Sequence, residues 1–130
     1  MATLTAKIEL KSTDLLSDSL SSNTKNEWTN ITEGGIISEA IIPTSGGSAK
    51  MLYNLADYTA KPAYVYLRNT DSTSSNLIYI RTVDPAGNED NFIRLKGGEW
   101  AWFPWGNSMS IKVFATTTLT ILEHGCFSTD

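Results

Sequence analysis

The chain has 130 residues, the usual size of one domain, which leaves no room for separate cofactor and substrate domains. Hydrophobic residues make up 41% of it, enough to build a core without metals or disulfides, so we expect an ordered globular fold. A net charge of -4 argues against nucleic acid as a partner, because a phosphate backbone attracts basic surfaces. The single cysteine, Cys126, excludes an intrachain disulfide scaffold.

Targeting and membrane signals are not found in the sequence. The first residues lack the basic and apolar regions of a secretory signal, and no apolar run approaches the roughly 18 residues that span a bilayer. We therefore expect a protein that is made in the cytoplasm and has no membrane partner.

The first predicted elements are a strand, a long polar segment and a second strand. Apolar and polar residues alternate from Leu4 to Leu10, which predicts a half-buried strand over residues 3–11. Residues 12–33 are rich in Ser, Thr, Asn and Asp, and predict an extended loop or arm, or an irregular pair of strands. A further strand is expected over residues 36–42.

The remaining chain predicts more short strands. Residues 49–58 fit both a helix stripe and a strand face, and their aromatic content favours the strand. Runs rich in β-forming residues and bounded by turn residues predict the other strands, at 63–68, 77–83, 92–95, 99–103, 109–115 and 119–122. The second of these is expected to form a hairpin with the first. About eight to ten short strands without a clear helix are typical of one all-β domain over residues 1–130, an antiparallel β-sandwich resembling a jelly roll.

Several predicted strands are apolar on both faces, although a two-layer sandwich buries only one face of each sheet. Tyr64 and Tyr66, for example, lie opposite Val65 and Leu67. Either another part of the chain or another subunit must cover the second face, and for a single aromatic residue the two are weighed equally. For the aromatic cluster over 100–105 we favour an interface, because Trp and Tyr are common in binding hot spots. The residues that we expect at a protein interface are Tyr64, Tyr66, Trp100, Trp102, Phe103 and Trp105.

Side chains with catalytic or metal-binding chemistry are sparse. His124 and Cys126 have no second His or Cys to complete a zinc site, and no Gly-x-Ser-x-Gly elbow accompanies His124. The acidic stretch 84–90 lacks the spacing of an EF-hand, and we interpret it as a solvated turn. We predict no enzymatic activity, no cofactor and no metal. A small hydrolase that uses Glu99 or His124 is the least favoured alternative.

Three stretches resemble small β-sandwich virion proteins of tailed bacteriophages. They are Ala63-Tyr64-Val65-Tyr66-Leu67-Arg68-Asn69-Thr70, Arg94-Leu95-Lys96-Gly97-Gly98-Glu99-Trp100-Ala101-Trp102-Phe103-Pro104 and Leu119-Thr120-Ile121-Leu122-Glu123-His124-Gly125-Cys126-Phe127. In such proteins a strand ending in Arg-Asn-Thr or Lys-Asn-Thr precedes a Leu-x-Pro-Gly-Glu turn that opens the next strand. This chain departs from the pattern, because Lys96-Gly97 stands where Pro-Gly is usual, or Gly97 replaces the proline.

The resemblance covers roughly the last 70 residues and implies a structural part of a phage particle, with no catalytic residues. The role that it favours is a head decoration protein that binds the major capsid protein and reinforces the shell. The alternative is a tail or fibre accessory module that binds a receptor or a glycan. Either protein would be located in the virion and is expected to be a homo-oligomer, a trimer or a dimer.

Overall fold

The chain forms two compact units, residues 1–32 and residues 33–130. The structure is a computed structural model that describes residues 2–14, 20–44, 48–58, 61–106 and 108–129. Part of the predicted 12–33 loop, residues 15–19, lies outside the described residues. The strands are β1 (Ala2–Ser12), β2 (Leu20–Glu33), β3 (Ile36–Ile41), β4 (Lys50–Tyr53), β5 (Ala63–Asn69), β6 (Ile78–Val83), β7 (Glu89–Leu95), β8 (Trp100–Trp105), β9 (Ser110–Ala115) and β10 (Thr120–Thr129), and η2 (Leu55–Tyr58) is a 3₁₀ turn.

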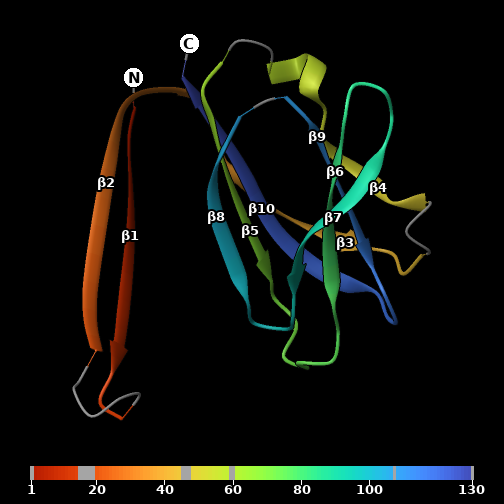
Figure 1. Cartoon of the computed structure of the whole chain (residues 1–130), viewed down its shortest axis with the longest axis horizontal. Helices are drawn as coiled ribbons and strands as arrows, with labels where there is room; N and C mark the ends of the chain where they lie inside the picture. The colour runs from red at the N-terminus through yellow and green to blue at the C-terminus, as the bar shows by residue number, and fades with distance from the viewer. Residues whose placement is uncertain (1, 15–19, 45–47, 59–60, 107, 130) are drawn as a thin grey trace. The chain divides into compact units, whose positions relative to one another are not determined.

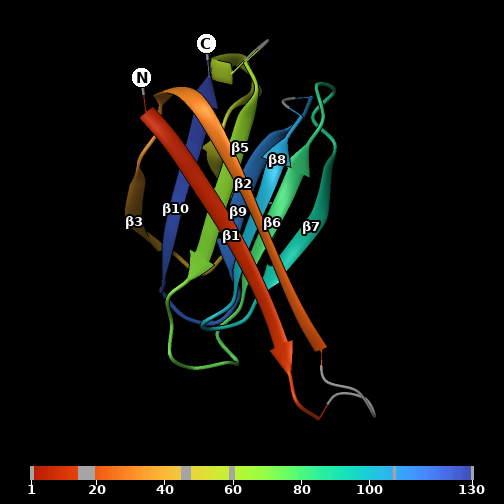
Figure 2. The same cartoon turned by 90° about the vertical axis from the view of Figure 1, so that its left-hand side faces the viewer.

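The first unit is a long antiparallel hairpin of β1 and β2 (Figure 2). Opposite residues pair without interruption from Leu4 with Trp28 to Ser12 with Leu20. Because side chains alternate along a strand, Leu4, Ile8, Leu20 and Trp28 share one face of this ribbon. The opposite face carries charged residues such as Lys7, which lies across from Lys25.

The second unit is the predicted β-sandwich, and its strand order is that of a jelly roll. One sheet has the order β3-β10-β5-β8 and the other has the order β4-β9-β6-β7, with all neighbours antiparallel. Consecutive strands mostly alternate between the two sheets, which face each other in Figure 1. Among the described residues, no helix is long and apolar enough to cross a membrane.

Two sequence predictions differ from the structure, and a third had been left open between two forms. Residues 20–33, predicted as a loop or as part of an irregular pair of strands, form strand β2 paired with β1, with a register shift between Ala2 and Leu4 and a positive φ at Asn30. Residues 55–58 form a 3₁₀ turn and not the end of a strand, and the Asn54 side chain stabilises its start by accepting a hydrogen bond from the Ala56 N–H at 3.0 Å. The expected hairpin of β5 with β6 does not form: β5 pairs with β10 and β8, whereas β6 pairs with β7 and β9 in the other sheet.

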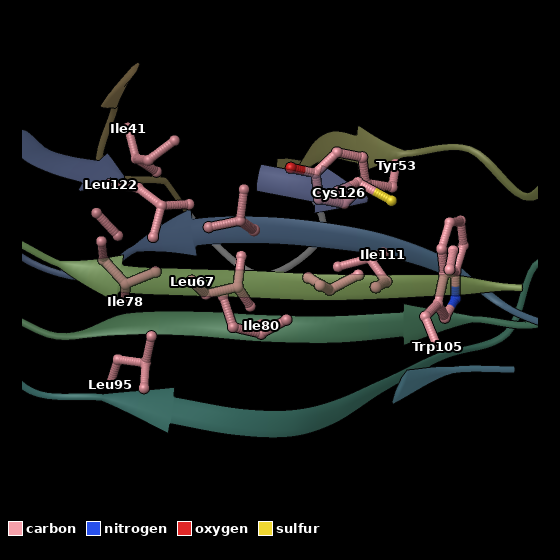
Figure 3. Packing of buried hydrophobic residues seen from close by; sticks show 14 residues of the cluster. Ile41, Tyr53, Leu67, Ile78, Ile80, Leu95, Trp105, Ile111, Leu122 and Cys126 are labelled. Carbon is pink, nitrogen blue, oxygen red and sulfur yellow. The ribbon is translucent and has the colours of Figure 1, made fainter. Parts of the chain in front are cut away.

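Alternate residues of the two sheets meet in a single apolar core. From β5, Val65 and Leu67 are fully buried, and from β6 Ile78 and Ile80 are fully buried opposite them (Figure 3). These β-branched and leucine side chains suit a pleated surface that is covered on one side. The core therefore uses the inward face of β5, which leaves its tyrosines on the outward face.

Candidate functional site

The outward face of the β3-β10-β5-β8 sheet carries a group of aromatic residues. On β5 the residues Ala63, Val65 and Leu67 are buried, so the tyrosines between them point away from the core. β8 pairs with β5 so that Trp102 lies across from Tyr66. We call this surface the aromatic face and define it by Tyr64, Tyr66, Trp100, Trp102 and Phe127.

Contacts within the aromatic face fix its side chains. The Tyr64 and Trp102 rings are stacked, with centroids 6.0 Å apart and planes within 3°, and Trp102 also packs against Phe127 at 6.1 Å. The Tyr66 hydroxyl donates a hydrogen bond to Glu123 Oε1 at 2.7 Å. Rings that are already held in place lose little conformational entropy when a partner binds them, so this surface is pre-organised for binding.

Trp100 is the most open member of the aromatic face. It is 52% exposed at the start of β8. Together with Tyr66, Arg68 and Gly98 it lines a shallow hollow of about 510 Å³. An exposed indole beside a guanidinium offers both apolar contact and hydrogen-bond donors to a bound partner.

Two of the six predicted interface residues lie on the other side of the sheet. Trp105 is buried in the core, where its indole N–H donates to the Met109 carbonyl oxygen at 2.8 Å. Phe103 packs against the same core and meets Phe92 edge to face at 5.5 Å. The alternation of side chains along β8 separates them from Trp100 and Trp102, so the consecutive aromatic residues do not form one surface patch.

In the Arg-Asn-Thr motif, the Asn69 side chain joins two loops through hydrogen bonds, and we call this arrangement the Asn69 clasp. This side chain is fully buried, and its amide Nδ2 donates to the carbonyl oxygens of Asn76 at 2.8 Å and Leu95 at 3.1 Å. Its Oδ1 accepts from the Asp71 N–H at 3.1 Å. One amide therefore holds the loop after β5 against the turn that precedes β8.

The Lys-Gly-Gly-Glu turn completes this clasp. Glu99 Oε2 accepts a hydrogen bond from the Lys96 N–H at 2.8 Å, and the Gly98 N–H donates to the Asn69 carbonyl at 2.8 Å. A Cβ on Gly97 would lie 2.4 Å from the Thr73 carbonyl oxygen, so only glycine fits there. The carboxylate of Glu99, considered above for hydrolysis, thus stabilises the turn.

His124 belongs to a buried hydrogen-bonded network. Its Nδ1 is 2.6 Å from the Tyr53 hydroxyl and its Nε2 is 3.1 Å from Glu39 Oε2, while Lys50 forms an ion pair with Glu39. Burial lowers the pKa of His124, and the Lys50 charge adds to this effect. The neutral imidazole then accepts from the Tyr53 hydroxyl and donates from Nε2 to Glu39.

Cys126 and two tyrosines lie beside this network, around a cavity of about 290 Å³. Burial raises the pKa of the Cys126 thiol to about 11 and that of Tyr58 to about 12, and it raises the pKa of Tyr53 further. All three groups therefore keep their protons at neutral pH. A protonated thiol is a weak nucleophile.

Two acidic residues of the 84–90 stretch, Asp84 and Glu89, bind other groups of the chain. Asp84 accepts hydrogen bonds from the backbone and side-chain nitrogens of Asn88, both at 2.8 Å, and these bonds lower its pKa. Glu89 accepts from Lys112 and, at 3.1 Å, from Arg81, and the Lys112 hydrogen bond lowers its pKa. Among the residues that the structure describes, no three His, Cys, Asp or Glu side chains gather where they could hold a metal ion.

Comparison with known proteins yields a likeness of fold. No protein-family model matches the chain, and no curated protein sequence matches it. A solved structure described by the words "Bacillus endospore appendages form a novel family of disulfide-linked pili" is similar, with a TM-score of 0.54 and 14% sequence identity over 75% of this chain and 87% of that one. The two chains share a fold. At this identity the likeness confirms the predicted all-β sandwich and shows nothing more.

Sequence reasoning missed Phe127 as a member of the aromatic face. The predicted last strand ended at residue 122, whereas β10 continues to Thr129. The sequence of residues 122–129 gives no clear apolar alternation, because the buried positions include His124 and Ser128 whereas the apolar Phe127 lies on the other face.

Proposed function

We propose that the protein is a non-enzymatic structural subunit that binds other proteins of an assembly through the aromatic face. The observation that carries this proposal is an outward-facing group of aromatic residues, in which the Tyr64 and Trp102 rings are stacked and Trp100 is half exposed. Aromatic side chains held on a sheet are typical anchors of protein interfaces. The likeness in fold to a protein of Bacillus spore appendages supports an assembly role, since that chain is described as forming pili.

The assembly that we propose is the head of a tailed bacteriophage, where this chain would decorate the shell by binding the major capsid protein. The support is the resemblance of three stretches to small β-sandwich virion proteins. Asn69 and the turn at 96–99, which belong to two of those stretches, are joined by hydrogen bonds in this chain. In a symmetric shell the same contact is repeated at many sites. Even a small interface at each site would therefore reinforce the whole particle.

Co-sedimentation with emptied capsids that lack the protein tests this proposal. We expect the wild-type chain to pellet with the shells and the Trp100→Ala variant to lose roughly tenfold or more in affinity, since a hot-spot residue contributes about 2 kcal/mol. Phe92→Ala is the matched control, because Phe92 is 53% exposed on β7 of the other sheet. Equal binding by both variants, or no binding of the wild-type chain, would contradict the proposal.

The hollow beside Trp100 favours a second candidate, a glycan-binding module of a tail or fibre. Sugar rings stack on exposed indoles, and the Arg68 side chain lining the same hollow can donate hydrogen bonds to hydroxyls. Saturable binding on a glycan array that is lost in Trp100→Ala, together with no binding to shells, would select this candidate over shell decoration.

A further inference from the structure

Strand β1 is the edge strand of its hairpin. Of the described strands, only β2 pairs with β1, so the other edge of this 11-residue strand presents backbone groups without a neighbouring strand. Residues 2–12 contain no proline and no glycine, and pairing with β2 runs without a bulge from Leu4 to Ser12. A long, regular edge of this kind is a template for another strand.

The hairpin also exposes apolar side chains on one face. Leu10 is 56% exposed, Leu20 40% and Ile8 38%. A two-stranded hairpin is marginally stable in water, whereas three or more strands with a hydrophobic face form a stable sheet. Adding strands at the free edge of β1 would therefore stabilise this unit.

The charged residues on the polar face of β1 favour one register for a strand that pairs with its free edge. Lys7 and Lys11 flank Glu9, and both form ion pairs with it at 3.7 and 3.0 Å. Suppose that β1 pairs antiparallel with β1 of a second copy about a two-fold axis at Ile8. Lys7 then lies opposite the partner's Glu9, and Glu9 lies opposite the partner's Lys7. On the apolar face Ile8 meets the partner's Ile8.

Other two-fold registers fit less well. An axis at Lys7 or at Glu9 places that residue opposite the identical charge of the partner, which is unfavourable. An axis at Leu10 again sets opposite charges together but pairs only residues 8–12, whereas the axis at Ile8 pairs residues 4–12. The longest register with complementary charges is therefore the one centred on Ile8.

We propose that a second copy of this chain binds at the free edge of β1, so that two hairpins form one four-stranded antiparallel sheet with Ile8 on its two-fold axis. This interface is independent of the aromatic face and does not require a capsid. Its failure would leave the shell-binding proposal untouched, and the reverse also holds.

A cysteine at the axis tests the register directly. Opposite residues of an antiparallel pair have Cα atoms about 4.5–5.5 Å apart, which a disulfide can bridge. We expect Ile8→Cys to give a covalent dimer under mild oxidation on a non-reducing gel. Leu10→Cys is the matched control, because four residues of offset separate its two copies by about 13 Å, too far for a bond. Wild type controls for Cys126, which is buried.

A dimer band with Leu10→Cys and none with Ile8→Cys would overturn the proposed register, and no dimer with either would overturn the interface.

Charge reversal gives an independent readout. We expect Lys7→Glu to weaken dimerisation about tenfold, because two attractive pairs become two repulsive ones, and Lys7→Glu with Glu9→Lys to restore it. Equal dimerisation of all three chains would contradict the proposal.

Discussion

Replacing Asn69 by alanine should destabilise the sandwich by about 3 kcal/mol. The substitution removes three side-chain hydrogen bonds and leaves the buried Leu95 carbonyl oxygen and the partly buried Asn76 carbonyl oxygen without their amide donor. A buried polar group that loses its partner costs about 1–3 kcal/mol, because water cannot replace the lost bond. The midpoint of urea unfolding measures this loss of free energy.

Asn88→Ala is the control for this result. The Asn88 side chain also forms a hydrogen bond within a turn, to Asp84 Oδ2 at 2.8 Å, but the turn is exposed and water can replace that bond. We expect a loss below about 1 kcal/mol. If Asn69→Ala unfolded at the same urea concentration as Asn88→Ala, the clasp would contribute nothing beyond an ordinary surface turn.

Gly34→Ala is the second change with a large expected effect. Gly34 has a φ of +155°, and a Cβ there would lie 2.4 Å from Cδ1 of Phe127. A residue other than glycine in such a conformation costs about 1–3 kcal/mol, and the clash adds to this cost, so we expect a total loss of roughly 2–4 kcal/mol. Because the Phe127 ring must move, its contact with Trp102 should change and the near-UV circular dichroism with it.

Gly35→Ala provides a neighbouring control. A Cβ on Gly35 would meet no atom within 4 Å, and its φ lies outside the range that disfavours other residues. We expect a change within about 0.5 kcal/mol and an unaltered near-UV spectrum. A Gly34→Ala variant as stable as Gly35→Ala would show that the close approach of Phe127 to the backbone is not required.

The fold class follows from local patterns in the sequence. Which strands pair with one another depends on contacts between residues that are far apart in the chain. Residues 63–68 are apolar on both faces, so their alternation alone does not say which face enters the core; in the structure Val65 and Leu67 are the buried ones. Local reasoning paired β5 with β6, since they are adjacent in the chain. The loop between them instead crosses from one sheet to the other, and the clasp at Asn69 that anchors it depends on Leu95, 26 residues further on.

The hairpin shows a second limit of local reasoning. Residues 20–33 are mostly polar, and their composition is typical of a loop. They form a strand because β1 satisfies their backbone and because only one face of a ribbon needs apolar residues, here Leu20 and Trp28. For the candidate interface, residue type identified the aromatic residues, but alternation along β8 assigns Phe103 and Trp105 to the core.

The mass of the purified wild-type chain in solution most directly tests the central claim, which is that this protein exposes surface that other protein subunits bind. Sedimentation velocity over a concentration series measures it. We predict that the mass rises with concentration from that of one 14.3 kDa chain to that of two or more. A mass that stays at one chain up to the highest soluble concentration, with no binding to emptied shells, would contradict an assembly role.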